Sequence, residues 1–231
     1  MGKAEALVEV VIVAAGKGTR IKSKTTKPFI VLQNKPLLFY SLKTFQNHLQ
    51  IKSIILVVGK PNFKKAWSII NKYKLSKIKC IVQGGEERKD SVINGLSQID
   101  KSTKFVLIHD AARPFVSKDL ITKILKALKE YKAAVPGIPV QDTLKRTDKK
   151  TRVVNTLERE YIHSIQTPQG LRTEILPLLF KNYRKSKSVY DDVMLIEGEV
   201  RVKVVSSSPK NFKITTPDDL RLARFYLSQK K

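Results

Sequence analysis

Apolar runs of strand length alternate with amphipathic segments along most of the chain. Four of the runs have the length and composition of strands that are buried on both faces of a sheet. These runs are residues 8–15, 53–58, 79–83 and 104–108. Segments with helical spacing follow them, as where Leu38, Leu42 and Phe45 share one face. These segments are residues 36–47, 62–73, 88–99 and 117–131.

The alternation continues, after one interruption, through the second half of the chain. Strand-like and helical segments again follow one another, at residues 133–136 and 140, 174–183, 191–197, 201–205 and 217–227. Alternating strands and helices predict an α/β fold with a mostly parallel sheet and helices on both faces. The chain has 231 residues and no stretch that resembles a linker, so we expect one domain over residues 1–231.

The interruption is a polar segment at residues 141–157. It contains "DTLKR", "TDKK" and "TRVVNTL", which are typical of a strand, a turn and a second strand. A hairpin this polar does not belong in a core. We expect a protruding arm over about residues 139–160, which is either a flap over the site or an extension that reaches another subunit.

Three polar loops follow predicted strands and are expected to meet at one edge of the sheet. They read "AAGKGTR", "QGGEER" and "HDAARP". Ligands of open α/β sheets bind at the carboxyl ends of the strands, where these loops lie. The sequence therefore predicts a binding site at this edge.

The first loop has Gly16, Gly18 and Arg20 at G-x-G-x-R spacing. A dinucleotide-binding loop needs a third glycine where Ile21 stands, and a P-loop needs Gly-Lys followed directly by Ser or Thr. The loop satisfies neither pattern. Its glycines still allow backbone N–H groups to approach phosphate oxygens, and Arg20 and Lys27 add positive charge.

The other two loops carry complementary chemistry. Gly84 and Gly85 precede a helix that contains Ser91, an arrangement suited to reading a base with backbone groups and a hydroxyl. Asp110, at a strand end, suits either a metal ion or a ribose. Arg113 suits a phosphate or a carboxylate partner, and we expect His109 to pack or to cap.

The net charge is +25, which invites a nucleic-acid hypothesis. The Lys and Arg residues are spread over the whole chain, and RNA-binding aromatic motifs, zinc-ligand spacings and a zipper are absent. An anionic small substrate explains the charge equally well, so we expect no nucleic-acid partner; a basic RNA-binding protein remains the alternative. One cysteine, no signal peptide and no membrane-length apolar run favour a cytoplasmic location without a membrane partner.

Taken together, the motifs resemble those of the 2-C-methyl-D-erythritol 4-phosphate cytidylyltransferase family of the non-mevalonate isoprenoid pathway. The matching segments occur in the family's order over roughly residues 8 to 227. They are "AAGKGTR", "KP" at 27–28, "GGEERKDSV", "HDAARPF", "DTLKR", "QTPQ" at 166–169 and "NFKITTPDDL" at 211–220. The related ribitol-5-phosphate cytidylyltransferases share much of this set, so a ribitol or other polyol phosphate remains an alternative substrate.

The resemblance implies a Rossmann-like three-layer α/β/α nucleotidyltransferase fold and a defined reaction. CTP and 2-C-methyl-D-erythritol 4-phosphate would give 4-CDP-2-C-methyl-D-erythritol and pyrophosphate. It also implies Mg²⁺, held mainly by the phosphates of CTP and not by a metal site of the protein. The arm would cross to the partner subunit of a homodimer.

The resemblance further implies roles for particular residues. Arg20 and Lys27 match transition-state stabilisers, and Arg159 and Lys213 match cations that hold the second substrate for attack. The positions that match the nucleotide site are Ala14, Ala15, Gly16, Gly18, Gly84, Gly85, Glu86, Ser91, Asp110 and Ala111. The positions that match the second-substrate site are Arg113, Thr143, Arg159, Thr167 and Lys213. One departure from the family pattern is Tyr190-Asp191-Asp192, where a Thr-Asp segment is common.

Overall fold

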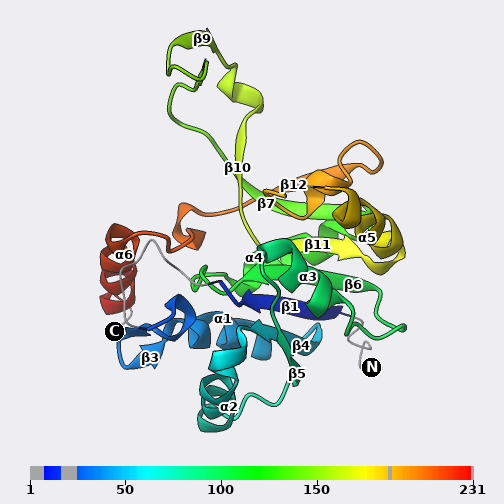
Figure 1. Cartoon of the computed structure of the whole chain (residues 1–231), viewed down its shortest axis with the longest axis vertical. Helices are drawn as coiled ribbons and strands as arrows, with labels where there is room; N and C mark the ends of the chain where they lie inside the picture. The colour runs from blue at the N-terminus through cyan, green and yellow to red at the C-terminus, as the bar shows by residue number, and fades with distance from the viewer. Residues whose placement is uncertain (1–7, 17–24, 187–188, 230–231) are drawn as a thin grey trace.

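The computed structural model describes residues 8–16, 25–186 and 189–229. A sheet of eight strands forms its centre, in the order β10-β7-β11-β6-β1-β4-β5 with β12 paired to β7 (Figure 1). The strands are β1 (Val8–Ala14), β4 (Ile51–Val58), β5 (Ile78–Gln83), β6 (Phe105–Asp110), β7 (Ala133–Pro139), β10 (His163–Ile165), β11 (Gln169–Arg172) and β12 (Val202–Ser206).

The central part of the sheet is parallel, as the sequence predicts. β1 pairs in parallel with β4 on one side and β6 on the other, so that Val10 lies between Ile54 and Leu107. β5 continues this parallel set beyond β4, and β12 runs parallel to β7. Only β10 and β11 are antiparallel to their neighbours. The carboxyl ends of β1, β4, β5 and β6 therefore lie at one edge.

Helices cover both faces of the sheet, which confirms the three-layer α/β/α arrangement. Side chains of α1, α2 and α4 form one core with Val10 and Ile12 of β1, and α3 and α5 form a second core with Val11 on the other face. The helices are α1 (Leu37–Gln46), α2 (Phe63–Lys72), α3 (Arg88–Leu96), α4 (Lys118–Ala127), α5 (Leu176–Lys185) and α6 (Pro217–Ser228).

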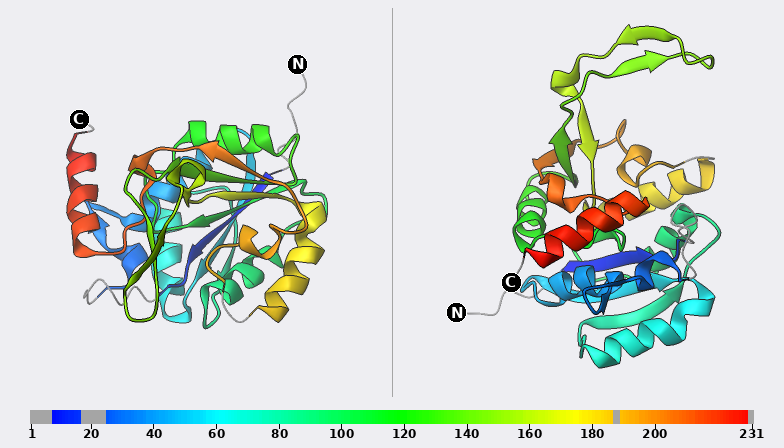
Figure 2. Two further views of the ribbon diagram at one scale, coloured as in Figure 1. Left: turned by 90° about the horizontal axis from the view of Figure 1, so that it is seen from above. Right: turned by 90° about the vertical axis from the view of Figure 1, so that its left-hand side faces the viewer.

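The last helix, α6, lies beside the sheet and closes a third apolar cluster (Figure 2). Its side chains Leu220 and Leu227 pack with Leu32 of the small β2–β3 sheet (Val31–Leu32 and Lys35–Pro36). Thr216 begins α6 as a capping box with Asp219, because the Asp219 N–H donates to the Thr216 hydroxyl and the Thr216 N–H donates to Asp219. In the residues that the structure describes, no helix is both long and apolar enough to cross a bilayer.

The polar hairpin projects from the body as an arm (Figures 1 and 2). It consists of β8 (Lys145–Thr147) and β9 (Val153–Thr156), and the short 3-10 helix Arg159–Tyr161 leads back to β10. Every residue of β8 and β9 is exposed. This segment therefore forms a surface projection and contributes nothing to the core of its own chain.

One local expectation is wrong, and two strands were not predicted. Residues 191–197 form only a 3-10 helix at Val193–Leu195, because Asp192 is drawn into the interior by polar contacts. Strands β10 and β11 were not expected at all. They are three and four residues long, and β11 lies between β6 and β7 in the sheet.

Candidate functional site

A cavity of about 580 Å³ opens at the carboxyl ends of the parallel strands. The three loops predicted to converge do so here, in the part of them that the structure describes. The cavity is lined by Val13, Ala14, Ala15, Gly16, Lys27, Pro28, Gln83, Gly84, Gly85, Glu86, Glu87, Arg88, Ser91, Asp110, Ala111, Ala112 and Lys213. Most of the predicted nucleotide-site residues are thus neighbours in space.

The loop before α3 is held by short-range contacts that require glycine. The Gly84 N–H donates to the Val58 carbonyl at 2.9 Å, and a Cβ on Gly84 would lie 2.2 Å from the Cβ of Ala15. The loop therefore rests directly against the end of β1. The two predicted segments meet at this point because Gly84 has no side chain that would push it away from the Ala15 methyl group.

Ser91 contributes its hydroxyl mainly to that loop. It accepts a hydrogen bond from the Gly85 N–H at 3.1 Å and donates one to the Glu87 carbonyl at 3.2 Å. The Ser91 side chain is part of the cavity wall, but its proton is committed to the backbone. Glu86 is exposed and lines the cavity nearby.

Asp110 is the electrostatic centre of the cavity. Its Oδ1 accepts a hydrogen bond from Arg88 Nε at 3.0 Å, and its Oδ2 lies 2.7 Å from Lys213 Nζ. Burial opposes ionisation of this carboxyl, but Arg88 and Lys213 outweigh burial and hold the pKa of Asp110 far below its usual range. Asp110 is therefore an anion that fixes two cations at the cavity.

Behind Asp110, His109 and Thr167 form a buried hydrogen-bond chain. The Asp110 N–H donates to Thr167 Oγ1 at 3.0 Å, and Thr167 Oγ1 lies 3.1 Å from His109 Nδ1. His109 Nε2 lies 3.1 Å from the Arg113 carbonyl, which only accepts, so Nε2 carries the proton. Burial lowers the pKa of His109 to about 4. His109 is a neutral structural link, as the sequence suggests, and Thr167 lies behind the cavity wall.

Of the remaining predicted residues that the structure describes, Arg113, Thr143 and Arg159 do not line the cavity. Arg113 donates to the Asn211 carbonyl at 2.9 Å and is not among the lining residues. Thr143 and Arg159 are exposed in the arm, where Arg159 donates to the Gln141 carbonyl. Gly18 and Arg20 lie outside the described residues.

Two residues of the site had no role assigned from the sequence. Arg88 lines the cavity and bridges Asp110 to the buried carboxylate of Asp192. Arg88 belongs to "GGEERKDSV", and Asp192 belongs to the segment that departs from the family pattern. The ion pair between Arg88 and Asp192 could not be predicted from the sequence, because 104 positions separate the two residues.

The cavity can bind a polyanion but offers no metal cage of its own. Lys27, Arg88 and Lys213 bring positive charge to it, and backbone N–H groups at glycines suit phosphate oxygens. Within residues 8–16, 25–186 and 189–229, no group of three or more His, Cys, Asp or Glu side chains is arranged to hold a metal ion.

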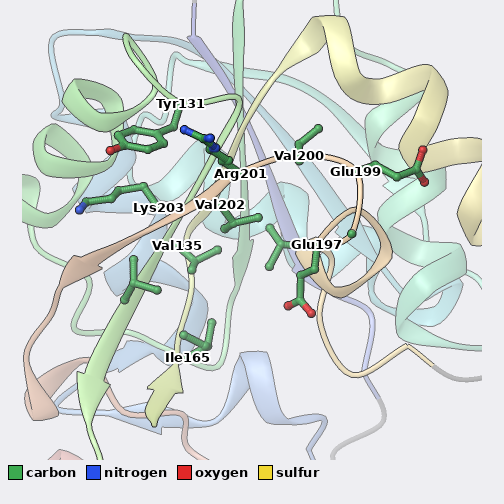
Figure 3. Close-up of a pocket in the computed structure, with 12 residues that line it drawn as sticks. Tyr131, Val135, Ile165, Glu197, Glu199, Val200, Arg201, Val202 and Lys203 are labelled. Carbon is green, nitrogen blue, oxygen red and sulfur yellow. The ribbon is translucent and has the colours of Figure 1, made fainter. Parts of the chain in front are cut away.

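A larger and more open cavity, of about 760 Å³, lies elsewhere and contains none of the predicted site residues. Figure 3 shows its apolar floor of Val135 from β7, Ile165 from β10 and Val202 from β12, with Glu197 and Lys203 toward the margin. It has no charged centre comparable to Asp110. Size alone therefore does not identify the site; the strand-end position and the ion cluster do.

The fold and the strand-end cavity define a nucleotidyltransferase-like α/β protein, and comparison with known proteins specifies it. The family model for IspD, 2-C-methyl-D-erythritol 4-phosphate cytidylyltransferase, matches residues 8–229, and the chain belongs to this family.

The relatives agree with this assignment over nearly the whole chain. The protein named 2-C-methyl-D-erythritol 4-phosphate cytidylyltransferase from Alkaliphilus metalliredigens is 42% identical over 228 residues, which are 97% of this chain and 94% of that protein. Its namesake from Clostridium botulinum is 41% identical, covering 95% and 97%. The crystal structure of 4-diphosphocytidyl-2C-methyl-D-erythritol synthase from Anaerococcus prevotii superimposes with a TM-score of 0.84 at 32% identity, covering 96% of this chain and 98% of that chain.

Proposed function

We propose that this protein transfers the cytidylyl group of CTP to 2-C-methyl-D-erythritol 4-phosphate and releases pyrophosphate. The observation that carries the proposal is the cavity at the carboxyl ends of the strands, where glycine loops meet a cluster of cations around Asp110. Family membership supplies the two substrates. We also propose that the reaction takes place in the cytoplasm, which a single free cysteine supports.

The reaction requires positioning and charge stabilisation more than proton transfer. An oxygen of the sugar-alcohol phosphate attacks the α-phosphorus of CTP, and the bond from that phosphorus to the pyrophosphate oxygen breaks. Since a phosphate is already ionised near neutral pH, the nucleophile needs no general base. The engagement of both His109 ring nitrogens in internal hydrogen bonds agrees with this mechanism.

The cations are then the catalytic groups. Negative charge builds on the oxygens around the α-phosphorus during transfer, and fixed cations stabilise it. We assign this role to Lys27 at the cavity and, on the family pattern, to Arg20. Lys213, also at the cavity, is assigned to hold the second substrate for attack. Ala14–Gly16, Gly84, Gly85 and Ala111 then hold the nucleotide through backbone groups.

We also propose that Mg²⁺ binds to the protein together with CTP. Of the lining carboxylates Glu86, Glu87 and Asp110, the buried one, Asp110, already pairs with Arg88 and Lys213. This donor set fits a metal held mainly by phosphate oxygens. When bound, Mg²⁺ would neutralise charge on the triphosphate.

The arm leads us to propose a homodimer with composite sites. Two strands with no buried residue are marginally stable alone, and Val153, Val154 and Tyr161 expose 62%, 61% and 76% of their surface. A second copy of the chain would cover them. Thr143 and Arg159, which are exposed in the arm, would then complete the second-substrate site of the partner.

A pyrophosphate-release assay with a substrate panel tests the proposed function. We expect turnover with CTP and 2-C-methyl-D-erythritol 4-phosphate, and a kcat/KM at least ~10-fold lower with ribitol 5-phosphate, because the two polyols differ in shape at the same pocket. UTP and ATP serve as nucleotide controls. Equal use of ribitol 5-phosphate would overturn the substrate assignment, and tight RNA binding without CTP-dependent turnover would overturn the enzyme.

A further inference from the structure

Arg88 lies between two carboxylates that come from distant parts of the chain. Its Nη1 and Nη2 donate to Asp192 Oδ1 and Oδ2, each at 2.8 Å, and its Nε donates to Asp110 Oδ1 at 3.0 Å. The bidentate pair fixes the plane of the guanidinium, because both of its terminal nitrogens are engaged at once. The direction in which Nε points at Asp110 is therefore set by Asp192.

Asp192 is itself anchored from the interior. Its side chain is fully buried, the Tyr183 hydroxyl donates to Oδ1, and its backbone N–H donates to Gln169 Oε1 at 2.9 Å. Tyr183 comes from α5, and Gln169 comes from β11. Asp192 is therefore held by two elements of the core, although neither Asp192 nor Tyr183 is among the residues that line the cavity.

The same chain of contacts reaches the cavity through Asp110. Its Oδ1 is taken by Arg88, which leaves Oδ2 to hold Lys213 Nζ at 2.7 Å. Each oxygen thus has one cation, and the division depends on Arg88 having a second carboxylate to satisfy its other nitrogens.

We propose that Asp192 is a positioning residue for nucleotidyl transfer: it holds the Arg88 guanidinium so that Asp110 keeps one oxygen for Lys213 and fixes that ammonium at the cavity. This inference rests on the proposed function. Without the charge of Asp192, Arg88 has Asp110 as its only carboxylate partner and turns both terminal nitrogens toward it. Arg88 then competes with Lys213 for the same two oxygens.

The three residues of the segment Tyr190-Asp191-Asp192 have different surroundings. Tyr190 is 85% exposed, and Asp191 Oδ1 accepts a hydrogen bond from the Met194 N–H at 2.8 Å. Only Asp192 enters the interior. The unusual tyrosine therefore stands outside the chain of contacts that leads to Lys213.

The test compares Asp192→Asn with two matched controls. Asp191→Asn makes the same substitution at the adjacent position. Tyr183→Phe removes one buried contact to Asp192 but leaves its contacts with Arg88 and Gln169, which still hold Asp192 in place. For Asp192→Asn we expect kcat to fall at least ~10-fold, since a small displacement of a catalytic cation costs this much or more. We expect the Kd of CTP, from calorimetry, to change less than ~3-fold, because the glycine loops that hold the nucleotide stay in place.

Both controls are expected to retain kcat within ~2-fold at a temperature where melting curves show all variants folded. Arg88→Lys keeps the positive charge but loses the planar guanidinium that binds Asp192 through two nitrogens. We expect it to lower kcat as much as Asp192→Asn does. The inference is overturned if Asp192→Asn keeps a normal kcat, or if Tyr183→Phe, at equal foldedness, loses as much.

A crystal structure of Asp192→Asn gives a readout that does not depend on the substrate. We expect Arg88 to engage both oxygens of Asp110 and Lys213 Nζ to leave Oδ2. An unchanged contact between Lys213 and Asp110 would contradict the inference even if the wild type turns over no polyol phosphate. Failure of the proposed function, by contrast, appears as an inactive wild type in the substrate panel.

Discussion

At the scale of single residues, His109 is a polar side chain beside the cavity whose role is structural. One ring nitrogen faces the Thr167 hydroxyl, and the other faces the Arg113 carbonyl. Protonation would place a second N–H against the Thr167 hydroxyl, whose own proton points toward the ring. Burial and this arrangement together keep the imidazole neutral.

The low pKa of His109 predicts a particular dependence of stability on pH. The unfolded chain binds a proton near pH 6.5, whereas burial lowers the pKa in the folded protein to about 4. Between these values only the unfolded state is protonated, so the contribution of His109 is complete above pH 6.5 and is lost as the pH falls toward 4. The free energy of unfolding then falls by about 1.4 kcal/mol per pH unit.

Urea titrations of the wild type and of His109→Gln between pH 7.5 and 4.5 measure this effect. The variant is expected to have a shallower slope, with a remainder from His48, whose pKa burial also lowers. NMR of the imidazole provides a second measurement. A His109 signal that titrates near pH 6.5 would contradict the assignment.

Among the elements, α3 and the loop before it depend on close approach to β1. A Cβ on Gly84 would lie 2.2 Å from the Cβ of Ala15 and 2.9 Å from Ser91 Oγ. We expect Gly84→Ala to separate the loop from β1, to cost about 1–3 kcal/mol of stability and to weaken CTP binding by roughly 10-fold. Gly198→Ala is the matched control, since a Cβ there meets nothing within 4 Å. Equal CTP affinity in both variants, measured by calorimetry, would show that the contact does not shape the site.

The elements also show which parts of the fold a sequence reveals. β1, β4, β5 and β6 are apolar runs, and the loops after β1, β5 and β6 could be assigned to one sheet edge before any coordinates. β10 and β11 could not, because three or four residues carry no periodic pattern and gain their stability from neighbouring strands. The same limit applies to the site. Asp110 and Lys213 were predicted to belong to it, but the pairing of Arg88 with Asp192 exists only after α3 and residues 190–196 have packed on the sheet.

For the whole molecule, the arm predicts an experiment on mixed subunits. If Arg159 serves the partner's cavity, Lys27→Ala and Arg159→Ala homodimers should both be nearly inactive, since each lacks one cation at every site. A heterodimer of the two has one site with both residues intact. Coexpression at equal levels should therefore restore about a quarter of the wild-type activity, because half of the dimers are mixed and each has one good site.

Differently tagged subunits allow the heterodimer to be purified and assayed alone. Mixtures of Lys27→Ala with a second cavity variant, Lys213→Ala, provide the control, because both residues come from the same subunit and no intact site can form. Absence of activity in the Lys27→Ala and Arg159→Ala heterodimer would place Arg159 in its own subunit's site or in none.

The position of β11 between β6 and β7 has a consequence for the order in which the chain folds during synthesis. The parallel unit β5-β4-β1-β6 is complete once Asp110 has been made. β7 is made next, yet all three of its partners in the sheet, β10, β11 and β12, come later. While the ribosome produces the arm, the apolar strand β7 and one edge of β6 have no strand to pair with, because β10, β11 and β12 have not yet been made. During this interval the unpaired strand edges expose the nascent chain to aggregation.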